Sequence, residues 1–173
     1  MHWLSQGSHN VLRSISVSNG SIYHGCKPSA KEILITPVNP LAPGNLVLPS
    51  LEEGKVVMVT GAGTGIGADT AFLLAERGAK MVIVGRRKAP LHGVEQRIVA
   101  AGGEVLVAMA DVSDIAQVEK VVENTLERLG ALHYGVNNAG VSGDNFDLLA
   151  LPKELWNETI AINLSSIFYC MKA

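Results

Sequence analysis

The feature that most constrains the fold of this chain is a short apolar run that leads directly into a glycine-rich turn. Val56 to Val59 are consecutive apolar residues, and Thr60 is followed by glycines at every second position: Gly61, Gly63, Gly65 and Gly67. A strand that is covered on both faces has no wet side, so it need not alternate apolar with polar residues. The run therefore predicts a buried parallel strand that enters a helix through a tight turn.

The glycines of this turn indicate an anion site. Without Cβ atoms, they can adopt positive φ and let the backbone approach a diphosphate. The first amides of the following helix lack intrahelical acceptors, so they can bind anions. Two spacings compete, namely G-x-G-x-x-G/A through Gly63, Gly65 and Ala68, and T-G-x-x-x-G-x-G from Thr60 to Gly67. A turn that binds nothing is the alternative, whereas an ATPase-type phosphate loop is disfavoured because no Lys-Ser/Thr follows.

From Lys55 onward, apolar runs alternate with helical patterns. Further strands are predicted at residues 81–84, 105–109 and 132–136, and helices at residues 68–77, 91–101 and 118–129 and from Pro152 onward. Asp114 and Gln117 resemble a capping box before the third helix. Strict alternation predicts a parallel sheet with right-handed crossovers and helices on both faces. We therefore expect an α/β, Rossmann-like doubly wound sheet whose first half has strand order 3-2-1-4, incomplete at the C-terminus, with ligands at the carboxyl ends of the strands.

Residues 1–50 differ from the rest. They are rich in Ser, Asn, Gly and Pro, contain Glu32 as their one acidic residue, and show no sustained helical or strand period. We predict an extended or disordered leader over residues 1–50 and a partial dinucleotide-binding domain over residues 51–173. The basic residues and serines weakly resemble an organelle transit peptide, but no basic amphipathic helix is present. A variable extension or an incorrectly assigned start is the simpler interpretation.

Charge and cysteine usage exclude several functions. The formal net charge of −2 gives no general attraction to nucleic acid or to an anionic membrane, and no apolar run is long enough to span a bilayer. Cys26 and Cys170 lie far apart and in no metal-binding spacing, so neither a disulfide framework nor a metal site is expected. This usage suits a reducing compartment. We expect a cytoplasmic protein, with organelle import as the alternative.

The residues that follow the second predicted strand favour one dinucleotide over another. An acid there would accept hydrogen bonds from the adenosine ribose and repel a 2′-phosphate. Gly85 occupies that position instead, and Arg86 and Arg87 follow it. Because a guanidinium binds phosphate through a planar fork, the sequence favours NADP(H), with NAD(H) as the alternative. Both arginines could also be ordinary solvated residues before a helix.

Polar residues also follow the third and fourth predicted strands. Asp111 could bind an adenine amino group, or it could cap the loop that leads to Asp114. The turn from Asn137 to Gly140 contains small residues that could lie against a cofactor, and an Asn amide there could tie neighbouring strands. Such Asn-rich turns also arise for conformational reasons alone.

Taken together, these motifs resemble the short-chain dehydrogenase/reductase family. They are Thr60-Gly61-x-x-x-Gly65-Ile66-Gly67, Asp111-Val112, Asn137-Asn138-Ala139-Gly140 and Asn163, in the family's order and approximate spacing. The resemblance covers about residues 52–173. It implies a Rossmann domain that binds NADP(H) or NAD(H), and a hydride transfer between nicotinamide and the carbonyl or secondary alcohol of a small-molecule substrate.

The resemblance also implies a role for each matched residue. Diphosphate would be surrounded by Gly61, Gly65, Ile66 and Gly67. The 2′-phosphate would be bound by Thr64 and Arg86, with Arg87 as a weaker candidate. Adenine would be held by Asp111 and Val112, and the cofactor ribose by Asn138, Ala139 and Gly140. Asn163 would support a proton relay by organising a helix carbonyl and a water. An ordinary helix asparagine is the alternative for Asn163.

The family's main acid/base residues do not fall within the matched region. The catalytic Ser and the Tyr-x-x-x-Lys follow the helix that contains Asn163, and this sequence reaches Ala173. We therefore expect the N-terminal part of an oxidoreductase that is not catalytic alone. The alternative is a truncated, non-catalytic module that binds dinucleotide or pairs with other subunits. The last helix is apolar on more than one side, so it could form a homo-oligomer. The sequence does not identify the substrate.

Overall fold

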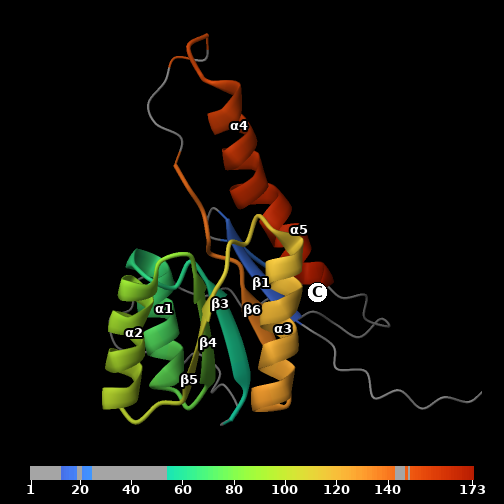
Figure 1. Ribbon diagram of the computed structural model, residues 1–173. Helices are drawn as coiled ribbons and strands as arrows, with labels where there is room; N and C mark the ends of the chain where they lie inside the picture. Colours follow the sequence, from blue (N-terminus) through green and yellow to red (C-terminus); the bar gives the residue numbers. More distant parts are fainter. Residues whose placement is uncertain (1–12, 19–20, 25–53, 143–146, 148) are drawn as a thin grey trace, which may run out of the picture.

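The computed structural model describes residues 13–18, 21–24, 54–142, 147 and 149–173 (Figure 1). From residue 54 onward, strands and helices alternate as the sequence predicts. In order they are β3 (Val56–Thr60), α1 (Gly65–Ala75), β4 (Lys80–Gly85), α2 (Lys88–Ala100), β5 (Val105–Met109), α3 (Ile115–Leu129) and β6 (Tyr134–Val136). In this described part of the chain, no helix is long and apolar enough to cross a membrane.

The sheet has the predicted strand order. Its neighbours run β5-β4-β3-β6, which is 3-2-1-4 when the strands are counted from Val56, and all three of these pairings are parallel. β3 lies between β4 and β6, with Val59 opposite Ile83 on one side and Val136 on the other. The strand order reverses beside β3, and the glycine-rich turn leaves the carboxyl end of that strand. Open α/β sheets bind their ligands at such a point.

Helices cover both faces of the sheet, so its central strands are buried on both sides. Val57 and Val59 of β3 pack in a cluster with residues of α1 and α2, while Val56 and Met58 face a second cluster formed with α3 and Cys170. Figure 1 shows α1 and α2 on one side of the sheet and α3 on the other. The lack of apolar/polar alternation in the Val56 to Val59 run follows from this double burial.

Two strands precede this unit, within the segment where the sequence suggests an extended or disordered leader. β1 (Arg13–Ser18) runs parallel to β6, and β2 (Ser21–His24) pairs antiparallel with β1. The sheet order is therefore β2-β1-β6-β3-β4-β5. The expected domain boundary near residue 50 and Cys26 lie outside the described residues. The division into a leader and a dinucleotide-binding domain stays a prediction.

Some predicted boundaries shift for local reasons. β6 begins at Tyr134 and not at residue 132, because the His133 side chain takes part in the pairing: its Nδ1 accepts from Val56 N at 3.0 Å, while His133 N donates to Val56 O at 3.0 Å. α1 begins at Gly65 and not at Ala68, so the glycines form its first turn.

The capping box predicted at α3 is present in altered form. Asp114 is the N-cap, but its Oδ1 accepts from Ala116 N at 3.0 Å. The Gln117 side chain donates to Asp114 Oδ2 at 2.9 Å, and its Oε1 accepts from Asp111 N at 2.9 Å. A standard box would have Gln117 accept from the N-cap amide. That amide instead donates to Asp111 O, so Gln117 links the cap to the loop after β5.

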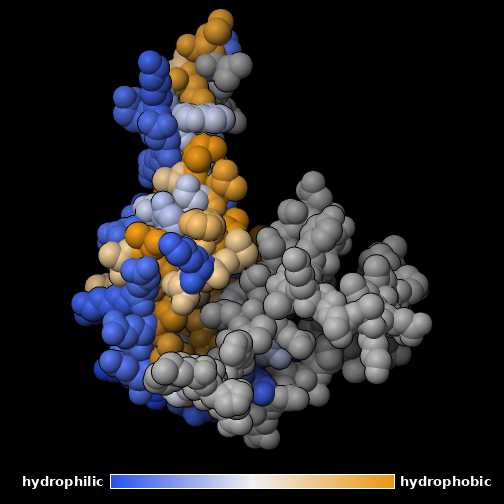
Figure 2. Space-filling model, turned by 90° about the vertical axis from the view of Figure 1, so that its right-hand side faces the viewer, coloured by the Kyte–Doolittle hydropathy of each residue, from blue (hydrophilic) through white to orange (hydrophobic). Residues whose placement is uncertain are grey.

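The single helix predicted from Pro152 onward is an arm of three segments, residues 153–172. They are α4 (Lys153–Ile160), a π-helical turn (Ala161–Ser165) and α5 (Ser166–Lys172), and Pro152 is the N-cap. α4 projects beyond the sheet and has no buried residue, whereas Cys170 of α5 is buried against α3 (Figure 1). Figure 2 shows an apolar stripe along the arm, and the large exposed apolar side chains there are Trp156, Leu164, Phe168 and Met171.

Candidate functional site

The corner where β3 and β6 end is held together by Thr60 and Asn138. Thr60 is buried, and its Oγ1 accepts from Asn138 N at 3.1 Å and from Ala139 N at 3.0 Å while donating to Val136 O at 3.4 Å. The Asn138 amide donates to Thr60 O at 3.0 Å and to Gly61 O at 3.4 Å. We call this set of contacts the β3–β6 corner. It fixes the glycine-rich turn against the turn that follows β6.

Two glycines in this corner leave no room for a side chain. Gly61 has a φ of +66°, and a Cβ there would lie 2.8 Å from Ala139 Cα. A Cβ on Gly67 would lie 2.5 Å from Gly61 O and closer still to Asn138 Nδ2. Both positions belong to the T-G-x-x-x-G-x-G spacing. Gly63, which belongs to the competing spacing, would bring a Cβ to 3.1 Å from Pro90 Cβ. The contacts of the corner therefore require glycine at positions of the T-G-x-x-x-G-x-G spacing more strictly than at Gly63 of the competing spacing.

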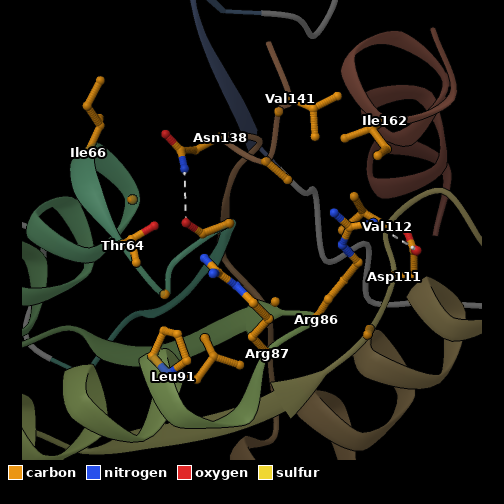
Figure 3. A pocket seen from close by; sticks show the side chains of 18 residues that line it. Thr64, Ile66, Arg86, Arg87, Leu91, Asp111, Val112, Asn138, Val141 and Ile162 are labelled. Atoms are coloured by element: carbon orange, nitrogen blue, oxygen red, sulfur yellow. Dashed lines mark hydrogen bonds and ion pairs between the residues drawn. The ribbon is translucent and has the colours of Figure 1, made fainter. Parts of the chain in front are cut away.

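A cavity of about 340 Å³ opens beside this corner, at the carboxyl ends of the parallel strands. Figure 3 shows its lining residues, which come from the glycine turn, the loops after β4 and β5, the turn after β6 and the arm. They are Gly61, Gly63, Thr64, Ile66, Gly67, Gly85, Arg86, Arg87, Pro90, Leu91, Ala110, Asp111, Val112, Asn138, Ala139, Gly140, Val141 and Ile162. Every site residue suggested by the sequence lies in this lining except Gly65 and Asn163.

The start of α1 is suited to an anion. Thr64 is the N-cap in an extended conformation, yet its side chain makes no capping hydrogen bond. The amides of the first helical turn cannot find acceptors within the helix, and they are favourable partners for negative charge. Gly65 has a φ of +57°, and no atom lies within 4 Å of the position where its Cβ would be. The space beside Gly65 is thus open.

The two arginines after β4 point in different directions. In Figure 3, Arg86 extends toward Asp111 and Val112, and Arg87 extends toward Thr64. Arg86 Nη1 lies 3.7 Å from Asp111 Oδ2 and 3.9 Å from Oε1 of Glu158. Among the described residues, Arg87 has no ion pair or side-chain hydrogen bond. The cavity thus has one cation shared between carboxylates and one that is open to a ligand.

Asp111 is held as a carboxylate by the loop after β5. Partial burial by itself would raise its pKa, but hydrogen bonds from Ser113 and the nearby Arg86 guanidinium outweigh that effect, so the pKa is lowered overall. Asp111 Oδ1 accepts from Ser113 N at 3.0 Å and from Ser113 Oγ at 2.7 Å. Asp111 therefore caps the loop that leads to Asp114, which was one of the two roles open from the sequence. Its Oδ2 remains directed at Arg86.

Asn163 lies just outside the cavity, in the π-helical turn of the arm. Its Oδ1 accepts from Val141 N at 2.8 Å, and its Nδ2 donates to Val141 O at 2.8 Å. One side chain thus pairs with both main-chain groups of Val141, as a neighbouring strand would. π-Helical turns occur often at functional sites. Asn163 thus joins the arm to the segment that leaves the β3–β6 corner. Its Oδ1 lies 3.4 Å from the position that a Cβ on Gly140 would occupy.

Several lining residues carry no sequence signal of their own. Pro90 and Leu91 read as helix residues, yet both line the cavity. Val141 and Ile162 enter the lining through the Asn163 contact. Within the described part of the chain, no group of three or more His, Cys, Asp or Glu could hold a metal ion.

One Tyr of the sequence has a Lys four residues later, so the expectation that no Tyr-x-x-x-Lys spacing occurs in this chain is wrong. The pair is Tyr23 and Lys27, and it precedes the glycine-rich turn. Tyr23 lies in β2, the outermost strand of the sheet, and Lys27 lies outside the described residues. Its position before β3 differs from that of the family's Tyr-x-x-x-Lys. We therefore assign no acid/base role to it.

Comparisons with known proteins agree on one family. Residues 55–173 match the family described as short chain dehydrogenase. An uncharacterized oxidoreductase of Listeria innocua is 40% identical over 115 residues, which are 66% of this chain and 46% of that protein. A cyclohexanol dehydrogenase of an Acinetobacter species is 37% identical over 119 residues, or 69% of this chain and 47% of its own. The chain spans about half the length of these relatives.

A solved structure extends the likeness to three dimensions. A metagenomic short-chain oxidoreductase, determined in complex with NADP, is 36% identical and superposes with a TM-score of 0.68. The superposition covers 70% of this chain and 55% of that protein.

Proposed function

This chain belongs to the short-chain dehydrogenase family, a family of oxidoreductases, and from that premise we propose that it forms the cofactor-binding part of an NADP(H)-preferring enzyme. The whole enzyme would transfer hydride between nicotinamide and the carbonyl or secondary alcohol of a small molecule. The observation that carries this proposal is the cavity in which an uncapped helix start, two arginines and Asp111 surround one space at the carboxyl ends of the strands.

The residues present fit a dinucleotide. Gly61, Gly65, Ile66 and Gly67 would hold the diphosphate, because the close-packed glycines keep the turn flat and the first amides of α1 are open to an anion. Thr64, Arg86 and Arg87 would bind the 2′-phosphate. Adenine would contact Asp111 and Val112, and the ribose would contact Asn138, Ala139 and Gly140.

When bound, the nicotinamide would donate the hydride to a carbonyl or accept it from an alcohol. This chain's own residues then bind, orient and enclose it. The Thr60 and Asn138 contacts fix the floor of the site before a ligand arrives, so little ordering remains to be done on binding. Asn163 is a positioning residue, since it holds Val141 through both main-chain groups. Substrate contacts and the main acid/base pair are not assigned to residues of this chain.

Cofactor preference can be tested by replacing Arg86 with Ala. We expect NADPH binding to weaken by about 1–3 kcal/mol, because a charge-assisted hydrogen bond to phosphate is lost. NADH, which lacks the 2′-phosphate, should lose much less. Fluorescence titration of each reduced cofactor with wild-type and Arg86→Ala protein measures both changes. Equal losses for the two cofactors would remove Arg86 from the phosphate site.

A second function, a non-catalytic module that binds dinucleotide or pairs with other subunits, is favoured by one observation. The arm exposes Trp156, Phe168 and Met171, each with about half of its surface accessible. Such a face suits a protein partner. This alternative predicts cofactor binding without any carbonyl-dependent oxidation of NADPH, whereas the enzyme requires such turnover in the assembled protein.

A further inference from the structure

The surroundings of Arg86 hold a feature that the cofactor assignment does not use. Its Nη1 atom lies within 4 Å of two carboxylates from separate elements, Asp111 in the loop after β5 at 3.7 Å and Glu158 in α4 at 3.9 Å. Asp111 has other partners, because its Oδ1 is bonded to Ser113. Glu158 has no other ion pair or side-chain hydrogen bond among the described residues. The Arg86 guanidinium is thus its only counter-charge there.

Glu158 does not itself line the cavity. It reaches the site only through Arg86, and both side chains of this pair are half-exposed. An exposed ion pair of this kind contributes little stability, so a ligand with a stronger charge can displace it. A phosphate near Arg86 would carry up to two negative charges and would compete with the Glu158 carboxylate for the guanidinium.

The second arginine differs in this respect. Arg87 extends toward Thr64 and away from Asp111 (Figure 3), and the ion pair that the structure gives Glu158 is with Arg86. A phosphate contact through Arg87 would therefore not compete with that ion pair. The two guanidinium groups that the sequence presents side by side are unequal as phosphate ligands.

We infer that Glu158 of α4 is a specificity-determining residue that weakens the cavity's discrimination for a 2′-phosphate by competing for Arg86. This inference rests on the proposed dinucleotide function. In the wild-type chain, the 2′-phosphate of NADPH must displace Glu158 from Arg86. NADH carries no charge at that position, so it binds without this competition. The arm thereby contributes to cofactor choice although it touches the cavity mainly through Ile162.

The test is Glu158→Gln, which removes the charge and keeps the shape. We expect NADPH to bind about three- to fivefold more tightly at low salt, because the Glu158 carboxylate no longer competes with the phosphate for Arg86. NADH should change less than about twofold. Fluorescence titration with both cofactors gives the ratio, and circular dichroism checks that folding is unchanged.

Two matched variants sharpen this experiment. Glu154→Gln removes the same charge from the first turn of the same helix, where Glu154 has no ion pair among the described residues; it should leave the cofactor ratio unchanged. Arg86→Ala combined with Glu158→Gln should bind NADPH no more tightly than Arg86→Ala alone. The inference is overturned if Glu154→Gln has the same effect, if both cofactors tighten equally, or if the gain persists without Arg86.

Failure of the proposed function would look different. If wild-type protein binds neither NADPH nor NADH, the dinucleotide site and the inference fall together. If it binds both but Glu158→Gln leaves their ratio unchanged, only the role of Glu158 is wrong.

Discussion

The β3–β6 corner and the arm belong to one chain, but they are built in opposite ways. In the corner, Thr60 is buried, and its hydroxyl makes three hydrogen bonds to main-chain groups of the chain. In the arm, α4 buries no residue and Phe168 exposes 56% of its surface. Asn163, Ile162, the Glu158–Arg86 ion pair and the inner side of α5 join the arm to the rest.

The difference shows what each region requires. The corner is held by contacts within the chain, because glycines stand where the backbone segments come close and hydrogen bonds join them. The arm has an apolar face that nothing in the described chain covers. Perturbing the corner should therefore change folding stability, and perturbing the outer face of the arm should change association.

The largest effect is expected at Gly67. In Gly67→Ala, the new Cβ would lie 2.5 Å from Gly61 O, so the backbone of the turn must move. We expect a loss of about 3 kcal/mol in the free energy of unfolding, even though Ala is the better helix former by about 1 kcal/mol. Urea denaturation followed by circular dichroism measures it.

Gly65→Ala is the matched control, two residues earlier in the same helix. No atom lies near its Cβ position, so the cost comes only from a φ of +57° and should be about 1–2 kcal/mol. Equal losses in the two variants would mean that crowding in the corner is not what requires glycine at Gly67.

The next effect is expected at Asn138. Asn138→Ala removes the amide that donates to Thr60 O and Gly61 O, which leaves two carbonyl groups without that partner. We expect a loss of about 2 kcal/mol. The neighbouring Asn137 is the control, because its buried Oδ1 has no hydrogen-bond partner among the described residues. Asn137→Ala should cost under about 1 kcal/mol by the same denaturation assay. If Asn137→Ala lowered the free energy of unfolding more than Asn138→Ala does, the Asn138 side chain would not be what joins β3 to β6.

The corner could be predicted from sequence because its signals are local. A doubly covered strand needs a continuous apolar run, and a close-packed turn needs glycine at fixed spacings. Val56 to Gly67 satisfies both within one stretch, and the strand order follows from the alternation of elements. Thr60 belongs to the motif, but the three hydrogen bonds of its hydroxyl depend on where β6 ends, which no local pattern specifies.

The rest depends on contacts between residues far apart in sequence. Glu158 reads as an ordinary helix glutamate, and only folding brings it to Arg86, 72 positions earlier by their numbers. The π-helical turn at Asn163 has no propensity signal, since it accompanies the pairing with Val141. The pairing of β1 with β6 was likewise not predicted, because the segment that contains β1 shows no sustained strand period.

The smallest effect on folding is expected on the outer face of the arm. Phe168→Ser removes an apolar ring that is already more than half exposed, so the monomer should lose less than about 0.5 kcal/mol in denaturation at low protein concentration. If a second copy covers this face, the same change removes buried apolar area and should weaken self-association about fivefold, measured by sedimentation velocity across protein concentrations. A loss of 1 kcal/mol or more in the monomer would mean that Phe168 packs within its own chain. The contrast between the corner and the arm would then be wrong, because the arm too would be held by contacts within its own chain.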